Sequence, residues 1–194
     1  MQTDLIWQAL EWPGLEHAIV SADATGFGAG GQLVAGPPVG PASVSYQLSC
    51  DAGWRVTGLT ISAASAAGSR TLTLSADQDG HWLADGESRP DLDGCIDVDI
   101  SLTPLTNTLP IRRLAWAQGS PQDLDVAYVS APDLTVRRVS QRYTPLAAGP
   151  TDNAAVYRYE SGSFKAELTV DGDGFVSDYP GLWRRVWPSE GADA

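Results

Sequence analysis

The stretch DGCIDVDISLTPLTNTLPIRRLAW, residues 93–116, decides the fold of this chain. Its first part, CIDVDISL (95–102), alternates apolar and polar residues with the two-residue period of a β-strand. The alternation places Asp97, Asp99 and Ser101 on one face of the strand and the apolar side chains on the other. We therefore predict a strand that carries two carboxylates in the same direction, roughly 7 Å apart.

The second part of the stretch predicts a short helix over residues 103–109. Ser101 or Thr103 could cap its N-terminus, and Pro104 suits the first helical turn. Pro110 would end the helix, because the residue before a proline is biased away from the helical conformation. A further strand is then expected to begin near residue 113.

Alternation of the same period continues on both sides of this stretch, as in RTLTLSA (70–76) and FKAELTV (164–170). Shorter strands are expected at 16–21, 44–50, 55–63, 113–117, 124–129, 136–144, 155–160 and 182–187. Turn-forming clusters separate many of them, and no helix-length pattern intervenes. We predict a mainly β fold: a large, curved, mostly antiparallel sheet, a roll or partly closed barrel, wrapped around a single short α-helix.

The length of 194 residues suits one domain over 1–194, and we expect residues 188–194 to form a disordered tail. Twenty-four acidic against twelve basic residues give a formal charge of −12 and a pI near 4.3. Phosphate backbones and anionic membrane surfaces repel such a protein, which argues against nucleic-acid binding.

The expected location is the cytoplasm. No apolar run approaches the roughly 18 residues of a membrane span, so no membrane insertion is expected. MQTDLIWQALEWPG (1–14) lacks the basic and apolar regions of a secretory signal. Cys50 and Cys95 are expected to be reduced thiols, with a single disulfide as the alternative.

Several motifs that could carry chemistry have simpler explanations. GFGAGG (26–31) matches G-x-G-x-x-G, but QLVAGPPVGP follows where a dinucleotide site needs a helix, so a loop or strand is expected. DGDG (171–174) lacks the other ligands of a calcium loop and predicts a hairpin turn. With His17 and His81 as its two histidines and no G-x-S-x-G, the chain is poorly provided for a zinc site or a triad. We expect no catalytic residue, no metal and no cofactor.

Asp97 and Asp99 are the candidate functional residues, and two interpretations of them stay open. They could lie on a solvated strand face, with Arg112 and Arg113 as ordinary salt-bridge partners. They could instead line a polar pocket, where carboxylates accept hydrogen bonds from sugar hydroxyls and aromatic rings supply stacking faces. A glycosidase pair fits less well, since two carboxylates on one strand point the same way rather than across a scissile bond.

Residues 92–114, LDGCIDVDISLTPLTNTLPIRRL, resemble the signature of a glycolipid-binding family of bacterial proteins long classed as a domain of unknown function. Further matches in order are WPGLEHAIV (12–20), VSYQLSCDAGWRVTGL (44–59), DGHW (79–82), VSQRYT (139–144) and YRYESGSFKAELTVDGDGFVSDYPGLWRRV (157–186). The likeness covers nearly the whole chain. One departure is Leu105, where the family leads us to expect an aromatic residue, and this exchange could alter the volume around the helix.

The resemblance implies a many-stranded sheet around one helix, a tight homodimer, remote similarity to lipoprotein-localisation factors and an acidic pocket proposed to hold a glycolipid. It carries over no reaction. Positions that match the family's polar motif residues are Asp97, Asp99, Thr103, Asn107, Arg112, Arg113, Gln141, Arg142 and Tyr143, with Glu16, Asp178 and Tyr179 in flanking segments. The candidate ligand-binding residues among them are Asp97, Asp99, Arg112, Arg113, Gln141, Arg142 and Tyr143.

Three functions are compatible with this sequence. The first is a non-enzymatic binding protein for a glycolipid or similar amphipathic ligand, with a role in glycolipid metabolism as a further expectation. In it Asp97 and Asp99 accept sugar hydroxyls, Arg112 and Arg142 order the carboxylates or meet a phosphate, and Tyr143 or a neighbouring Trp stacks on the ligand. The second is a hydrolase that acts on a glycoconjugate through paired carboxylates. The third is a dimeric structural module without a ligand.

Overall fold

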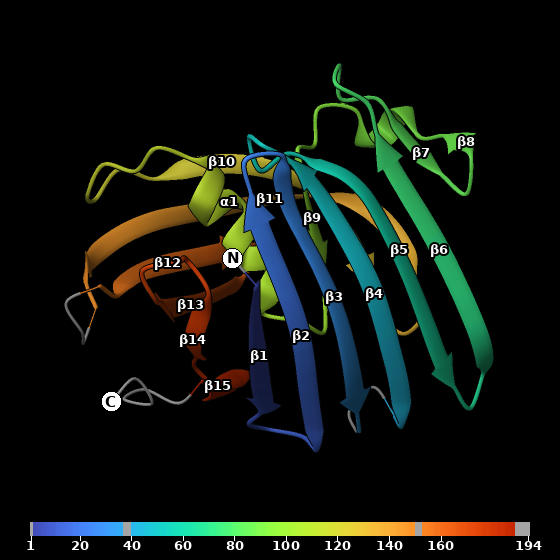
Figure 1. The fold of residues 1–194 in the computed structure, drawn as a ribbon, viewed down its shortest axis with the longest axis horizontal. Helices are drawn as coiled ribbons and strands as arrows, with labels where there is room; N and C mark the ends of the chain where they lie inside the picture. The colour runs from blue at the N-terminus through green and yellow to red at the C-terminus, as the bar shows by residue number, and fades with distance from the viewer. Residues whose placement is uncertain (1, 37–39, 150–152, 189–194) are drawn as a thin grey trace.

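The protein is described by a computed structural model over residues 2–36, 40–149 and 153–188 (Figure 1). The strands are β1 (Gln2–Ala9), β2 (Gly14–Asp23), β3 (Gly26–Ala35), β4 (Ala42–Asp51), β5 (Val56–Ser65), β6 (Gly68–Ala76), β7 (Trp82–Ala84), β8 (Glu87–Ser88), β9 (Asp97–Ile100), β10 (Gln122–Ser130), β11 (Thr135–Ala148), β12 (Ala155–Ser161), β13 (Phe164–Val170), β14 (Val176–Tyr179) and β15 (Trp183–Trp187). The helices are the short 3₁₀-helices η1 (Pro90–Leu92) and η2 (Leu105–Asn107) and the α-helix α1 (Thr108–Arg113). Of the tail expected at 188–194, residues 189–194 lie outside the described residues.

All fifteen strands belong to one sheet, whose order is β8-β7-β6-β5-β4-β3-β2-β1-β15-β14-β13-β12-β11-β10-β9. The strands pair antiparallel throughout, except that β9 pairs parallel with β10. Because β1 pairs with β15, the first and last strands lie side by side in the middle of the sheet. This sheet confirms the predicted fold class, a large curved and mostly antiparallel sheet with one short α-helix.

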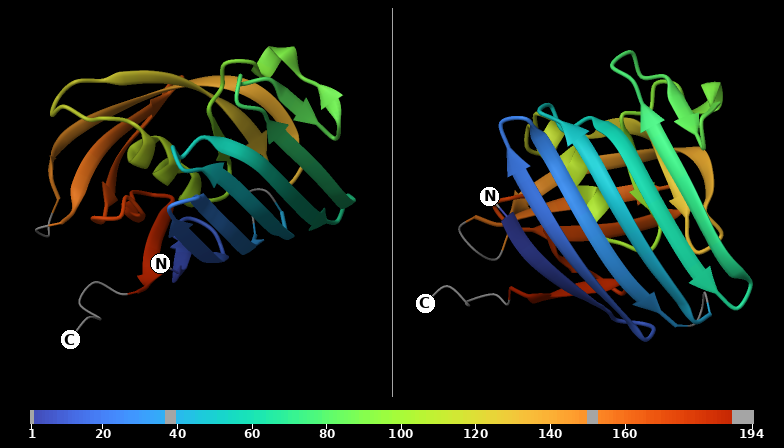
Figure 2. Two further views of the ribbon diagram at one scale, coloured as in Figure 1. Left: turned by 45° about the horizontal axis from the view of Figure 1, so that its top comes forward. Right: turned by 45° about the vertical axis from the view of Figure 1, so that its right-hand side comes forward.

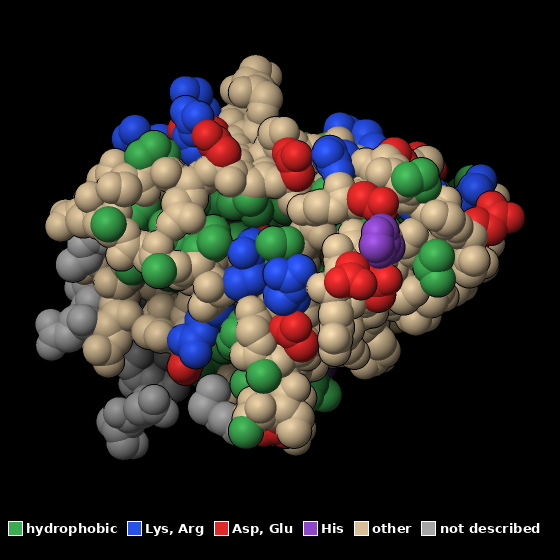
Figure 3. All heavy atoms as spheres, turned by 90° about the horizontal axis from the view of Figure 1, so that it is seen from above, with side chains coloured by type: hydrophobic (Ala, Val, Ile, Leu, Met, Phe, Trp, Pro, Cys, Tyr) green, Lys and Arg blue, Asp and Glu red, His purple; other side chains and the backbone are tan. Residues whose placement is uncertain are grey.

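The curvature of the sheet creates two walls with an interior between them. Figure 2 shows β1–β6, coloured blue to green, as one wall and the orange to red C-terminal strands as the other, with α1 enclosed between them. Seen from above in Figure 3, apolar side chains are visible between the walls, with basic and acidic side chains around them. The interior is therefore the place where polar groups of distant strands can meet.

The two free ends of the sheet, β8 and β9, are connected by residues 89–96. The Arg89 Nη2 atom donates to the backbone oxygen of Val136 on β11 at 3.0 Å. Further along, the Val56 amide on β5 donates to the Ile96 oxygen at 3.1 Å. This segment therefore bridges the two walls where the strands themselves do not pair.

Period-two burial explains why the strands form one continuous core. Along β4 the side chains of Val44, Tyr46, Leu48 and Cys50 are buried, and the residues between them are exposed. Each such strand turns one apolar face inward, and burying that face is the main stabilising term of the fold. Cys50 and Cys95 are both buried and free, as expected for reduced thiols. Within the described residues, no helix has the length and apolar character needed to cross a membrane.

The central helix differs from the prediction at its C-terminal end. It was expected over 103–109 with Pro110 as its stop, but η2 and α1 continue without a break to Arg113. Pro110 is the third residue of α1 and lies in its first turn, where proline is tolerated. The strand expected at 113–117 is absent for the same reason, because Arg113 still belongs to the helix.

Five strands, β1, β3, β7, β8 and β14, lie outside the strand ranges that the sequence predicted. β1 was not anticipated, although Leu5, Trp7 and Ala9 are buried at alternate positions. β3 contains the glycine-rich 26–31, for which a loop or a strand was expected, and the structure selects the strand. Glycine lacks the side chain that period-two reasoning depends on, which explains the weak signal there.

Candidate functional site

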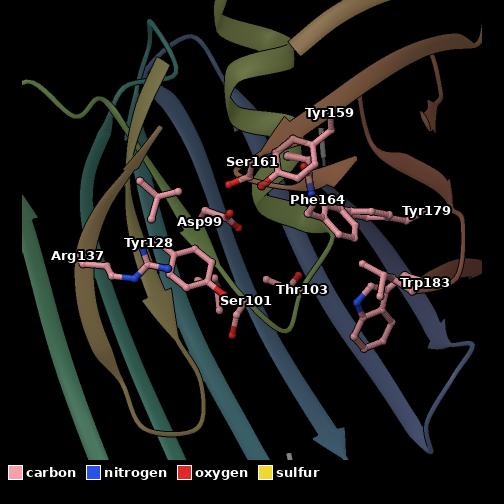
Figure 4. Close-up of a pocket in the computed structure, with 14 residues that line it drawn as sticks. Asp99, Ser101, Thr103, Tyr128, Arg137, Tyr159, Ser161, Phe164, Tyr179 and Trp183 are labelled. Carbon is pink, nitrogen blue, oxygen red and sulfur yellow. The ribbon is translucent and has the colours of Figure 1, made fainter. Parts of the chain in front are cut away.

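A cavity of about 250 Å³ lies in the interior at one side of η2, where β9–β12 approach the C-terminal strands (Figure 4). Its polar lining consists of Asp99 on β9, Ser101, Thr103 and Asn107 on the segment that leads into α1, Arg137 on β11 and Ser161 on β12. Its aromatic lining consists of Tyr128, Tyr159, Phe164, Tyr179 and Trp183, one each from β10, β12, β13, β14 and β15. The remaining lining residues are Ile100, Val139 and Leu182.

Asp99 is the one acidic residue that lines this cavity. Its Oδ2 atom accepts a hydrogen bond from Gln141 Nε2 at 2.6 Å, and its Oδ1 atom accepts one from Thr106 Oγ1 at 3.2 Å. Burial raises the pKa of Asp99, and the hydrogen bonds from Gln141, Thr106 and Tyr159 oppose that rise. Asp99 is therefore a carboxyl group held by neutral donors at the edge of an open space.

The aromatic residues form a wall opposite Tyr128. The ring centroids of Tyr159, Phe164 and Tyr179 lie 6.1 to 6.3 Å from one another, within the range of favourable aromatic pairs. In Figure 4 Tyr128 lies on one side of the cavity, with Phe164, Tyr179 and Trp183 on the other. The polar groups of Asp99, Ser101 and Thr103 lie between these two aromatic sides, so a bound ring could contact apolar faces and hydrogen-bonding groups together.

Thr103 connects the cavity to a second buried acid, Glu16 on β2. Glu16 Oε1 accepts hydrogen bonds from Tyr46 Oη at 2.6 Å and from Thr103 Oγ1 at 2.7 Å. Glu16 is fully buried, and its Oε2 atom has no hydrogen-bond partner. Burial raises the pKa of Glu16 to about 7, against the lowering effect of the two hydrogen bonds.

Gly31 on β3 makes this contact between β2 and β4 achievable. Tyr46 is the cross-strand partner of Gly31, and its ring crosses over the glycine to reach Glu16. A Cβ atom at Gly31 would overlap the Tyr46 ring. The glycine-rich motif at 26–31 therefore has a packing role, which its formal match to a nucleotide motif would not suggest.

Asp97, two residues before Asp99, does not line the cavity. Its carboxylate is fully buried and bonds Arg113, with Arg113 Nε donating to Oδ1 at 3.2 Å and Nη2 donating to Oδ2. Burial raises the pKa of Asp97, and Arg113 opposes this rise. Asp97 therefore fastens β9 to the C-terminal end of α1, and the solvated-face interpretation is wrong for this residue.

Gln141 and Tyr143, also predicted as site residues, support the cavity from behind. The side chains of Gln141 and Tyr143 are both buried. Gln141 donates the hydrogen bond to Asp99 described above. Tyr143 Oη donates to Asn107 Oδ1 at 2.8 Å, so it positions a lining residue without lining the cavity itself. Tyr143 was predicted to stack on a ligand, but the aromatic side chains that line the cavity are the five named above.

Arg112 and Arg142 lie away from the cavity. Arg142 alternates with Gln141 and Tyr143 along β11, so it faces outward, where its guanidinium pairs with Asp123 at 2.7 Å. Arg112 is exposed, with its guanidinium 5.2 Å from the ring centroid of Trp54. Neither arginine orders Asp97 or Asp99, and neither lines the space where a ligand phosphate would have to sit.

Tyr128, Tyr159, Phe164 and Trp183 were missed as site residues. Tyr159 and Trp183 are buried residues of the predicted strands 155–160 and 182–187, so alternation could have placed them in the interior. Their meeting around one cavity depends on the order of β10–β15 and on sheet curvature, which the sequence pattern does not specify.

Within the described residues, one cluster has the spacing of metal ligands: Asp77, Asp79 and His81, all exposed. Asp77 Oδ1 accepts hydrogen bonds from the amides of Asp79 and His81, each at 2.9 Å. The cluster is therefore explained as a side-chain-capped turn between β6 and β7.

Comparison with known proteins supports a specific assignment. Residues 4–185 match the family described as "Putative glycolipid-binding". The crystal structure of a DUF1089 family protein from Pseudomonas aeruginosa is 40% identical, with a TM-score of 0.77, over 88% of this chain and 92% of that one. A β-barrel-like protein of the DUF1849 family from Brucella abortus shares only the fold, with 10% identity and a TM-score of 0.51 over 95% of this chain and 93% of that one. No curated protein matches the chain. Because the family match spans nearly all of the sequence, the chain belongs to the family described as "Putative glycolipid-binding".

Proposed function

We propose that this protein binds the sugar head group of an amphipathic ligand, such as a glycolipid, in the cavity beside Asp99, and catalyses no reaction on it. The observation that carries the proposal is the combination of a hydrogen-bonded carboxylate and five aromatic side chains around one cavity. Sugar rings present hydroxyl donors at their edges and apolar C–H groups on their faces. A carboxylate and aromatic faces are complementary to these two features.

The size of the cavity supports recognition of a head group rather than a whole lipid. Its volume of about 250 Å³ is below the range of roughly 300 to 1,000 Å³ that is typical for drug-sized ligands. The space corresponds to about eight water molecules at roughly 30 Å³ each. One sugar ring is of that order, and an alkyl chain would have to leave through the mouth, where Phe164 is 41% exposed.

Two other hollows, of about 590 and 580 Å³, lie on the outer face of β2–β6. They are larger, but serine, glycine and short aliphatic side chains dominate their lining. Neither lining includes a carboxylate or a Phe, Tyr or Trp ring. They offer little to a sugar beyond weak surface hydrogen bonds, so the interior cavity is the better candidate.

The same geometry argues against the hydrolase alternative. Glycoside hydrolysis uses two carboxyl groups on either side of the scissile bond. Of the described residues that line the cavity, Asp99 is the single acid, and the carboxylate of Asp97 is held by Arg113. The homodimer and the cytoplasmic location stay predictions of the sequence.

Titration with an alkyl glycoside tests the proposal. Octyl glucoside is added to the wild-type protein and to Asp99→Asn, and binding is followed by calorimetry and native mass spectrometry. We expect saturable binding by the wild-type protein and a loss of about tenfold or more in Asp99→Asn, from the hydrogen bonds to a charged acceptor.

Arg142→Gln is the matched control, because Arg142 was predicted to contact the ligand but faces solvent. It should bind as the wild-type protein does. Equal affinity of Asp99→Asn and the wild-type protein, or an effect confined to Arg142→Gln, would overturn the assignment of the cavity.

A further inference from the structure

Asp99 differs from the other acid on its strand in having no cationic partner. Asp97 is paired with Arg113, whereas no ion pair to Asp99 is present within the described part of the chain. Its hydrogen bonds come from the neutral side chains of Gln141, Thr106 and Tyr159. A desolvated carboxylate without a counter-charge is unfavourable, so a fold that keeps one open to a cavity leaves the counter-charge to a ligand.

The cavity around Asp99 is built from groups that attract cations. Aromatic rings carry negative potential on their faces, and several rings around one space form the kind of cage that holds ammonium groups. Tyr128 stands on one side of the space, with Phe164, Tyr179 and Trp183 opposite (Figure 4). The Tyr128 ring already accepts one cation, since the guanidinium of Arg137 lies 5.0 Å from its centroid.

From these observations we infer that the head group bound beside Asp99 carries a protonated amine, as in an amino sugar. The inference rests on the proposed function, because it specifies the chemistry of the sugar that occupies the same cavity. The ammonium group would lie against the Asp99 carboxylate, and the ring of the sugar would contact the aromatic wall. The excess of acidic residues, with a formal charge of −12, also favours the approach of a cationic ligand.

An anionic head group fits this cavity poorly. Arg137 is the one basic residue that lines it, and this residue is exposed, where solvent screens its charge. A phosphate inside would face the Asp99 carboxylate at short range. Arg137 and a bound amine would instead repel each other, so removing the Arg137 charge has opposite effects on cationic and anionic ligands.

Proton release gives this proposal an independent signature. Burial raises the pKa of Asp99, so the free protein keeps a proton on this carboxyl to a higher pH than an exposed aspartate would. A bound ammonium group favours the carboxylate form, and binding should therefore expel that proton. A neutral sugar acts on this proton only through hydrogen bonds to the carboxylate, so it should expel less of it than the amine does.

The test compares glycosides that differ only in the substituent at C2 of the sugar. Octyl glucoside, its 2-amino-2-deoxy analogue and the N-acetyl derivative of that analogue are titrated at pH 7 into the wild-type protein, Asp99→Asn and Arg137→Gln. Choline is included as an ammonium probe without a sugar. We expect the amine to bind about tenfold more tightly than the neutral glycosides, and Asp99→Asn to abolish that difference. Arg137→Gln should strengthen binding of the amine relative to binding of octyl glucoside, because the loss of a positive charge favours only the charged ligand.

The outcomes separate this inference from the function on which it rests. Equal affinities for the amine and the neutral glycosides would overturn the inference and leave sugar binding in place. Binding of choline with the same dependence on Asp99, but of no glycoside, would support the amine and overturn the sugar. Binding of none of the probes would overturn both. Tighter binding of a phosphorylated glycoside than of the amine, with a loss of affinity in Arg137→Gln, would overturn the inference and show that the cavity prefers an anionic head group.

Discussion

At the scale of single residues, the interior holds three acids with three different environments. Asp97 is paired with an arginine, Asp99 is held by neutral donors beside a cavity, and Glu16 is buried with one unpartnered oxygen. Desolvation raises the pKa of all three carboxyl groups. The surroundings of each carboxyl group therefore decide its role: Asp97 joins β9 to α1 through Arg113, and Asp99 lines the cavity.

Glu16 should make the protein less stable as pH rises from about 4.5 to 7. Its pKa is raised from 4.5 to about 7 on folding, so in that window the folded chain keeps a proton that the unfolded chain has lost. Below this pH range Glu16 is protonated in both the folded and the unfolded chain. Above it the free energy of unfolding stays lower by about 3 kcal/mol, taking roughly 1.4 kcal/mol per pKa unit. Urea unfolding of the wild-type protein and of Glu16→Gln between pH 4.5 and 8 measures this.

The variant should gain stability relative to the wild-type protein as pH rises, because glutamine has no proton to lose. Its amide oxygen can still accept the hydrogen bonds of Tyr46 and Thr103. A difference between the two proteins that stays constant across the pH range would show that Glu16 titrates normally in the folded chain.

Gly31→Ala should destabilise the protein by roughly 1 to 3 kcal/mol, the usual cost of overfilling a core. The added methyl group would overlap the Tyr46 ring that reaches across β3 to Glu16. Gly30→Ala is the matched control, because its Cβ would meet only the flexible end of the Gln47 side chain, with Nε2 at 2.6 Å. Thermal unfolding of both variants checks this, and an equal cost at the two glycines would contradict the role of Gly31.

At the scale of elements, β9 and the segment from η2 to Arg113 form the interior unit of the fold. Thr106 on η2 bonds Asp99, and Arg113 at the end of α1 bonds Asp97, so strand and helix are joined at both carboxylates. Both sides of β9 are consequently covered, which is why Val98 is as buried as Asp97. The position of Asp99 at the cavity follows from these contacts.

Asp97→Asn should lower the free energy of unfolding by about 3 kcal/mol, because it leaves the mostly buried guanidinium of Arg113 without its counter-charge. Asp97→Asn with Arg113→Met should recover much of that loss, since the unpaired charge is gone. Chemical denaturation of both measures this. Asp123→Asn, which breaks the exposed pair with Arg142, should have no measurable effect. An equal cost for the two aspartate variants would contradict the distinction.

The sequence could predict elements better than it could predict the site. Period-two alternation identified most strands and their inward faces, and the same period showed that Asp97 and Asp99 share one face. It could not tell that Pro110 lies in the first turn of α1 rather than after its end, since proline is compatible with both. Alternation along β11 does separate Gln141 and Tyr143 from Arg142, so this arginine could have been assigned to the outer face.

At the scale of the whole molecule, the cavity exists because one sheet is curved until its C-terminal strands enclose β9 and η2. The aromatic lining comes from five strands between residues 122 and 187, whereas Asp99 comes from β9, the edge strand that pairs with β10. No short segment contains the site, and strand order alone brings its residues together.

A crystal structure of the protein with bound octyl glucoside, or with its 2-amino analogue, is the most direct measurement of ligand binding by the interior cavity. We predict that the sugar ring lies between Tyr128 and Trp183, with a hydroxyl or amine group within hydrogen-bond distance of the Asp99 carboxylate, and that the alkyl chain leaves past Phe164. A ligand seated on the outer face of β2–β6, with the interior cavity filled by water, would contradict the proposed function.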